Sequence, residues 1–389
     1  MINNLYLVLK RELYRISKSP TLIFISLIGP IIGFLLVYWL FSAGVIRDIP
    51  IVIVDQDNTA SSRKIGRLCG TAQTVKITGK LNDLNEAHSL MNTGHTEAII
   101  YIPAETEKKL LTGNSAEIKI FINNTNLAKG GSINLGLYKT LATISAGIKI
   151  QIYQKKGKTY QQAFENVLPV NLKSHVLFNP FGNYSYFLAL GLFPLMITIF
   201  TLLGTLYVVG IELKTGTAGE LMQTAGNNVV TASIGKLLPY TFMFFVNVMI
   251  MNFIIFRWLG TPLKGSILWL VGSEIIMIVA YQAIALFLLA LTANLRLSLS
   301  LGSAYTMMGF SFSGLTFPIM GMPWFIKLMS NIFPYVFWLN AFIGQTLKGE
   351  PTFIALKKII ILFIFIGIGI ISLPLLKKKL SHEENWGKD

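Results

Sequence analysis

The chain of 389 residues is 53% hydrophobic and only 13% charged, with a net charge of +15. Soluble domains usually carry about a quarter charged residues, so this composition excludes an ordinary soluble protein. Basic loops beside apolar runs, and the lysine run at 377–379, attract anionic lipid headgroups. We therefore expect membrane lipids, and not nucleic acid, to contact the basic residues.

Apolar runs that are long enough to cross a membrane recur along the chain. A bilayer core of ~30 Å requires about 20 mostly apolar residues in a helix. Six segments reach that length, namely 21–42, 185–210, 237–257, 266–292, 298–317 and 355–376. We predict a membrane α-helical protein with about six transmembrane helices, and a seventh helix within 324–346 is the alternative.

The first predicted element is an amphipathic helix over 1–20, in which Leu5, Leu9 and Leu13 recur at i, i+4 and i+8 on one stripe. The apolar run 21–42 follows it. A basic start before an apolar run also occurs in signal peptides, whose apolar core is only ~7–15 residues and ends at a small-residue cleavage site. This run is longer and no such site follows, so we predict a retained first transmembrane helix.

Residues 43–184 predict an inserted α/β domain outside the cytoplasm. Strands are expected at 51–54, 74–78, 97–102 and 117–122, and helices at 60–69, 83–92, Pro103–Asn114 and 132–156, with 160–178 completing the domain. Strands that alternate with helices favour parallel pairing in βαβ units. The single cysteine, Cys69, cannot form an internal disulfide, so packing alone must stabilise this domain.

The loop 211–236 follows the second predicted span. Thr217 and Glu220 stand three residues apart, which is the spacing of a capping box at the start of a short helix. Leu221 and Met222 would be its apolar contacts, and Gly226 would end it. Such a helix can dock into a groove of a cytosolic partner, and a helix lying on the lipid surface is the alternative.

Polar side chains occur inside the next two spans. Asn247 and Asn252 lie on the third span, Arg257 at its outer end, and Glu274 about 10 Å into the fourth at 1.5 Å per residue. An intramembrane acid normally faces a partner or a water-filled path. Either a Glu274–Arg257 pair lines an export pathway, or these residues form a structural link between neighbouring helices.

Three prolines interrupt the segment 318–346. Pro318, Pro323 and Pro334 each remove a backbone donor that a continuous helix would use. Broken backbone at membrane depth persists only where protein or water satisfies it. We predict a re-entrant segment within the five-helix region 185–376, with a crossing segment as the alternative.

The basic residues also predict the orientation. If the amino terminus is cytoplasmic, the short inner segments 1–20, 211–236, 293–297 and 377–389 contain eleven Lys and Arg residues, and the short outer segments contain six. The positive-inside rule therefore places both termini in the cytoplasm, including the basic tail 377–389.

A search for catalytic chemistry finds no candidate site. The chain lacks the G-x-x-x-x-G-K-[ST] phosphate loop. Its histidines, His88, His95, His175 and His382, have no acid or thiol partners at metal-ligand spacing. We therefore predict that the chain is not an enzyme and binds no metal or cofactor itself.

Two groups of motifs resemble the type-2 ABC exporter permease family. The run Glu212-x-x-x-Gly216-Thr217-x-x-Glu220-Leu221-Met222, followed by Gly235–Tyr240, is similar to the coupling-helix loop of that family. The second group comprises Ser313–Pro318, Met322–Trp324, Pro334–Tyr335 and Leu347–Gly349. Matches at Val52–Asn58, Ala98–Pro103 and Leu110–Gly113 point to the subgroup with a large domain after the first span, similar to multidrug-export permeases.

The resemblance implies a permease subunit of an ATP-driven exporter that moves a drug-like or lipophilic compound out of the cytoplasm or inner membrane. Its partners would be a cytosolic ATP-binding subunit, which holds ATP and magnesium, and a second copy or a related permease. The resemblance also implies that the chain lies in a bacterial inner membrane. A periplasmic adaptor and an outer-membrane channel would be further partners. Segment 1–20 would be the connector helix, and the coupling residues would be Glu212, Gly216, Thr217, Glu220, Leu221 and Met222.

Two other functions stay open. The chain could be a non-transporting scaffold or receptor that acts through the outer domain. It could also export a polysaccharide or glycolipid, although such permeases usually lack the large outer domain. The sequence does not identify the substrate.

Overall fold

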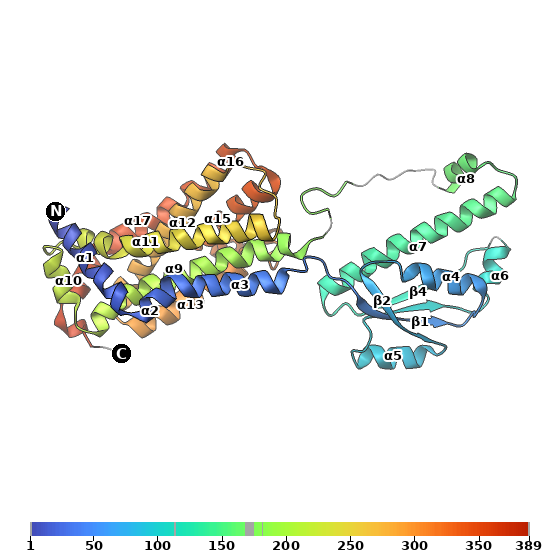
Figure 1. Cartoon of the computed structure of the whole chain (residues 1–389), viewed down its shortest axis with the longest axis horizontal. Coiled ribbons are helices and arrows are strands. Elements are labelled where there is room, and N and C mark those ends of the chain that lie inside the picture. The colour runs from blue at the N-terminus through green and yellow to red at the C-terminus, as the bar shows by residue number, and fades with distance from the viewer. Residues whose placement is uncertain (1, 113, 168–174, 181, 388–389) are drawn as a thin grey trace. The chain divides into compact units, whose positions relative to one another are not determined.

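The computed structural model describes the whole chain except residues 1, 113, 168–174, 181 and 388–389. The expected helix end at Gly113, the middle of segment 160–178 and the tail residue Lys388 lie outside the described residues. The chain divides into a helical unit, residues 1–44 with 176–389, and an α/β unit, residues 45–175 (Figure 1).

Five helices of the helical unit are long and apolar enough to cross a membrane, and the bent pair described below brings the total to six if it forms one span. They span Pro20–Phe41, Ser185–Lys214, Val229–Trp258, Ile267–Thr292 and Thr352–Ser381. Together with the sheet described below, they confirm the predicted membrane α-helical fold with an α/β domain.

These helices are built from shorter segments, several of which contain a π-helical turn. The first comprises α2 (Pro20–Ile23), η1 (Phe24–Ile28) and α3 (Gly29–Phe41). The others are η2 (Ser185–Ala189) with α9 (Leu190–Lys214), α11 (Val229–Phe253) with η3 (Ile254–Trp258), α12 (Ile267–Thr292), and α16 (Thr352–Ile360) with α17 (Leu362–Ser381). Helix α1 (Ile2–Lys18) precedes them, α10 (Ala218–Thr224) joins α9 to α11, and η6 (Glu383–Asn385) ends the unit.

The structure differs from the prediction at 298–317. Helix α13 (Leu295–Ser311) has 17 residues, or about 25 Å at 1.5 Å per residue, which is shorter than a ~30 Å bilayer core. The helix ends at Ser311 because the chain turns at Gly314, whose φ is +85° and whose missing Cβ leaves room for Ile319. A side chain at this position would meet Ile319 at 2.7 Å.

The proline-rich segment forms a bent helix pair. After η4 (Ile319–Gly321), α14 (Trp324–Ser330) and the continuous α15 (Pro334–Ile343) with η5 (Gly344–Lys348) meet at 85°. Pro318 and Pro323 stand immediately before η4 and α14, and Pro334 opens α15. Proline suits these positions because the first turn of a helix uses no N–H donor.

Close contacts hold the helical unit around α12. In α17, a Cβ added to Gly369 would meet the Cβ of Ala283 on α12 at 2.5 Å, so glycine permits the two backbones to approach closely. The buried ring of Trp338 donates through Nε1 to Ser273 Oγ at 3.2 Å. Buried Tyr335 donates to the carbonyl of Gly191 at 2.6 Å, so α15 is bonded to both α12 and α9.

The α/β unit contains a four-stranded sheet in the order β2-β1-β3-β4. Strands β1 (Ile49–Asp55), β2 (Val75–Leu81) and β3 (Ala98–Ile102) pair in parallel through β1, with Ile51 opposite Ala98 and Ile77, while β4 (Lys119–Ile122) runs antiparallel to β3. The expected βαβ pairing is therefore present, with one antiparallel edge strand.

Each face of the sheet is covered by helices. Helices α4 (Ala60–Cys69) and α7 (Leu127–Lys155) lie on one side and α5 (Leu84–Asn92) on the other (Figure 1). Alternate residues of β1 point to the two faces, so that Ile51 and Ile53 join the α4–α7 core and Val52 and Val54 join the α5 core. Helices α6 (Thr106–Leu111) and α8 (Tyr160–Val167) complete the unit.

Two predicted helix starts in this unit were wrong. Pro103 does not open a helix, because α6 begins at Thr106 after Glu105, which adopts a left-handed φ of +61°. The long helix begins at Leu127, five residues before Ser132, because the side chain of Asn126 caps it by accepting from the N–H groups of Ala128 and Lys129.

Candidate functional site

Four elements meet at one end of the helical unit. Helix α1 packs against α11, and the short α10 contacts α1, α9 and α11. Figure 1 shows α1 and α10 together at this end, near the amino terminus. The carboxyl end of α9 and the start of α11 bring side chains from distant parts of the sequence into one buried polar cluster.

Glu212, near the end of α9, is the centre of this cluster. Its fully buried carboxylate accepts from both terminal nitrogens of Arg11, at 2.9 and 3.0 Å, and from Lys236 Nζ at 2.7 Å. Arg15 and the hydroxyl of Thr217 also donate to it. The bidentate arginine contact is the geometry in which guanidinium binds a carboxylate most strongly.

A second buried carboxylate completes the cluster. Glu12 of α1 accepts from Lys236 Nζ at 2.7 Å and from the hydroxyl of Tyr240 at 2.6 Å. Lys236 thus bridges Glu12 and Glu212, and all three side chains are at most 1% exposed. The network joins α1 to α9 and α11 through charges that are all paired.

The charges of the network nearly balance. Three cations face two buried carboxylates, and exposed Glu220 on α10 approaches Arg11 at 3.7 Å. A buried ion pair adds little to stability compared with apolar packing, but removing one partner costs about 3–5 kcal/mol because a charge is left buried and unpaired. A shift of any one of these helices would therefore leave a buried charge without its partner.

Helix α10 differs from its expected form. Thr217 precedes the helix but makes no capping hydrogen bond, because its hydroxyl donates to Glu212; the predicted capping box with Glu220 is therefore wrong. Leu221 and Met222 are buried within the helical unit. The exposed face carries Glu220, whose side chain is 72% exposed, and Gln223.

The ends of α10 lie in turns, and a carboxyl-terminal segment covers one side of the helix. Gly216 and Gly226 adopt positive φ of +73° and +66° before and after it. A Cβ on Gly219 would meet the ring of Trp386 at 2.7 Å, and the N–H of Gly387 donates to Leu213 O at 3.0 Å.

The intramembrane polar residues form separate contacts. Asn252 donates to the buried Glu274 at 2.8 Å, and Asn247 donates to the backbone carbonyl of Ser26 at 2.8 Å. Arg257 is exposed, and among the residues that the structure describes it forms no ion pair with Glu274. The expected Glu274–Arg257 pair is thus replaced by a Glu274–Asn252 link, which joins α12 to α11.

Sequence reasoning singled out Glu212 and Thr217 but missed the other members of the buried cluster, which are Arg11, Glu12, Arg15, Lys236 and Tyr240. Arg11, Glu12 and Arg15 lie on the predicted amphipathic helix, but the buried stripe of that helix is Val8, Glu12 and Ile16 and not the leucines, of which Leu13 is 50% exposed. The available signal was Glu12, a charged residue that lies four positions from each of the apolar residues Val8 and Ile16. Lys236 and Tyr240 lie in the Gly235–Tyr240 motif, but their contacts with Glu12 gave no comparable signal, because Glu12 is more than 200 residues away.

No group of His, Cys, Asp and Glu suited to a metal ion occurs within the described ranges. The long apolar helices, the inserted sheet unit and the buried cluster at one helix end define a multi-pass membrane protein with a network of paired charges at that end.

The family model described as ABC-2 family transporter protein matches residues 20–373, so the chain belongs to the ABC-2 transporter family. Members are permeases that pair with ATP-binding subunits and are not catalytic themselves. The chain is 24% identical over 225 residues to the probable multidrug ABC transporter permease YbhS of Escherichia coli K12 and to the protein of that name from strain O157:H7. The match covers 56% of this chain and 59% of each relative.

Proposed function

We propose that this chain is the permease subunit of an ABC exporter for a drug-like or lipophilic compound, driven by a separate cytosolic ATP-binding subunit that holds ATP and magnesium. The similarity to relatives named as probable multidrug permeases supports this substrate class. The protein would work with a second copy or a related permease in a bacterial inner membrane, with both termini in the cytoplasm. A periplasmic adaptor and an outer-membrane channel would complete the route.

The buried cluster around Glu212 is the observation that carries the proposal. A short helix with an exposed polar face can receive force from a partner only if it is held firmly by the helices that must move. Helix α10 meets this condition, because Leu221 and Met222 are buried and Arg11 approaches Glu220. Movement of α10 would then pass through Arg11 and Glu212 to α1, α9 and α11.

The roles within the loop follow from exposure. Glu220 and Gln223 are the groups available to the ATP-binding subunit. Glu212, Thr217, Leu221 and Met222 face inward and transmit the movement, and Gly216 provides the turn that sets the helix apart from α9. The partner therefore contacts a polar surface, and the apolar residues act as the anchor.

A two-step experiment tests this function. The chain is first purified in mild detergent with its associated proteins, and we expect an ATP-binding subunit among them. The ATPase rate of the reconstituted complex is then compared between the wild type and Glu220→Arg. The charge reversal lies on the exposed face and should lower the stimulated rate at least fivefold without unfolding the permease.

Glu86→Arg is the matched control, because Glu86 is an exposed helical glutamate on α5 of the α/β unit. It should leave the ATPase rate unchanged. A preparation with no ATP-binding subunit, or an equal ATPase rate in both variants, would count against the exporter and in favour of a scaffold role.

A further inference from the structure

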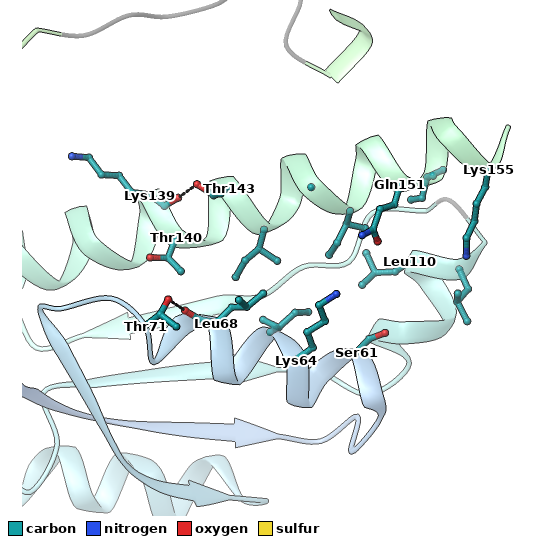
Figure 2. A pocket seen from close by; sticks show the side chains of 16 residues that line it. Ser61, Lys64, Leu68, Thr71, Leu110, Lys139, Thr140, Thr143, Gln151 and Lys155 are labelled. Carbon is teal, nitrogen blue, oxygen red and sulfur yellow. Dashed lines mark hydrogen bonds between the residues drawn. The ribbon is translucent and has the colours of Figure 1, made fainter. Parts of the chain in front are cut away.

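A groove of about 560 Å³ separates α4 from the second half of α7 in the α/β unit (Figure 2). Its volume is within the range of roughly 300–1,000 Å³ that small-molecule sites occupy. The lining residues on α7 extend from Lys139 to Lys155, which is about 24 Å at 1.5 Å per residue. The groove is therefore long.

The groove exists because the two halves of α7 pack differently. In the first half, Ile133 and Leu137 are fully buried in the core against α4 and the sheet. In the second half, Ile144, Ile148 and Ile152 are only partly buried and line the groove. These side chains leave an apolar surface that α4 does not cover.

Gly147 lies between the partly buried Ile144 and Ile148 of α7. A Cβ added there would meet no atom within 4 Å, so the backbone of α7 is open to the groove at this point. On the opposite wall, Leu68 of α4 and Leu110 of α6 extend the apolar lining. The middle of the groove is thus suited to an apolar chain.

One end of the groove is basic. Figure 2 shows the ammonium groups of Lys64, from α4, and Lys155, from α7, directed into the groove, with Leu110 and Gln151 between them. Neither lysine forms an ion pair with any residue that the structure describes. The carboxylate near this end belongs to Glu107, which already accepts from the N–H and hydroxyl of Ser61 at 3.2 and 2.7 Å.

We propose that this groove binds a single-chain amphiphilic anion, namely a long-chain fatty carboxylate. The carboxylate lies between Lys64 and Lys155, and the alkyl chain follows Leu68, Ile144 and Ile148 past Gly147. Charge complementarity selects an anion over a neutral amphiphile, because the lining includes lysines and no carboxylate. The elongated apolar lining along α7 suits an extended chain better than a compact ring system.

Photo-crosslinking of the full chain tests the site. The protein is reconstituted in nanodiscs of zwitterionic lipid and exposed to a palmitate analogue with a diazirine in its chain, and the labelled residues are identified by mass spectrometry. We expect saturable labelling of α4 and α7, displaced by unlabelled laurate and at least tenfold less by dodecanol. Labelling confined to the helical unit, or equal displacement by dodecanol, would overturn the proposal.

Charge-reversal variants test the head-group contact. The double variant Lys64→Glu with Lys155→Glu should reduce labelling of α4 and α7 at least tenfold. Lys149→Glu is the matched control, since Lys149 is an exposed lysine of α7 that does not line the groove. It should stay within twofold of the wild type, and equal labelling in the double variant would overturn the proposal.

Gly147→Trp tests the chain contact without changing charge. The indole would fill the middle of the groove, where space is open, and should abolish labelling while the circular dichroism spectrum and the unfolding temperature stay those of the wild type. Undiminished labelling in this folded variant would place the probe elsewhere and refute the site.

Discussion

Two buried carboxylates of the helical unit have opposite surroundings. Glu212 binds two arginines, a lysine and a hydroxyl, so its charge is fully compensated. Among the described residues Glu274 accepts one side-chain hydrogen bond, from the amide of Asn252, and its Oε1 has no hydrogen-bond partner. The first carboxylate is part of a tightly bonded joint between helices, and the second is a single weak link.

The difference shows why burial alone does not define a role. A fully satisfied network restricts movement, because each member loses several bonds when a helix shifts. The Glu274 carboxyl loses only the bond from Asn252 when the helices shift. Mutations of the two sites should therefore have very different effects.

The largest effect is expected for Lys236→Met. Loss of the ammonium leaves Glu12 and Glu212 facing each other without their bridge, and the free energy of unfolding should fall by about 3–5 kcal/mol. Thermal unfolding of the purified protein in detergent measures this change. Lys10→Met, an exposed lysine on the same α1 helix, should shift it by less than about 0.5 kcal/mol.

Glu212→Gln should have the next largest effect. Glutamine retains the shape but leaves Arg11, Arg15 and Lys236 with Glu12 as their only buried anion, so the free energy of unfolding should fall by about 2–3 kcal/mol. The same thermal assay applies. If the free energy of unfolding changes as little as in Lys10→Met, the Glu212 carboxylate is not needed to compensate the buried cations.

Glu274→Gln should change the free energy of unfolding by less than about 1 kcal/mol. The glutamine carbonyl can still accept from Asn252, and no cation loses its partner. A destabilisation equal to that of Glu212→Gln, measured side by side, would remove the contrast between the two carboxylates. Lost export with unchanged stability would instead favour a pathway role for Glu274.

The smallest effect is expected for the buried thiol of Cys69 in the α/β unit. Burial raises the pKa of the Cys69 thiol to about 11, so at pH 8 it is a thiol and should resist maleimide until the α/β unit unfolds. Because the folded-state pKa exceeds the ordinary value of 9.0, this thiol stabilises the fold below pH 9 and that contribution is lost as the pH rises toward 11. Rapid labelling of the folded protein at pH 8 would contradict this.

The sequence predicted the elements whose signals are local. Long apolar runs identified the membrane helices, and the apolar pattern of 51–54 and 97–102 identified the parallel strands. Elements with competing interactions were predicted less well. The sequence pairs Thr217 with Glu220 in a capping box, but in the fold the Thr217 hydroxyl donates a hydrogen bond to Glu212.

The buried cluster could not be predicted for a different reason. The Lys236–Glu12 and Tyr240–Glu12 contacts join residues more than 200 positions apart, and nothing in either neighbourhood indicates the other. Only Glu12, a charge within an apolar stripe, indicated that a buried partner was required. The end of α13 was missed because apolar residues continue past the turn at Gly314.

The contacts around α10 also affect how this protein should be handled in the laboratory. Asn4 lies against Gly226 in the turn after that helix and Trp386 lies against Gly219 on its side, so segments close to both ends of the sequence contact α10 or the turn that follows it. A fluorescent protein or affinity tag attached beside either segment would disturb the packing around α10. A tag inserted in a distant surface turn, such as the one at Gly94, where a side chain would meet no atom within 4 Å, would leave the contacts of α10 unchanged.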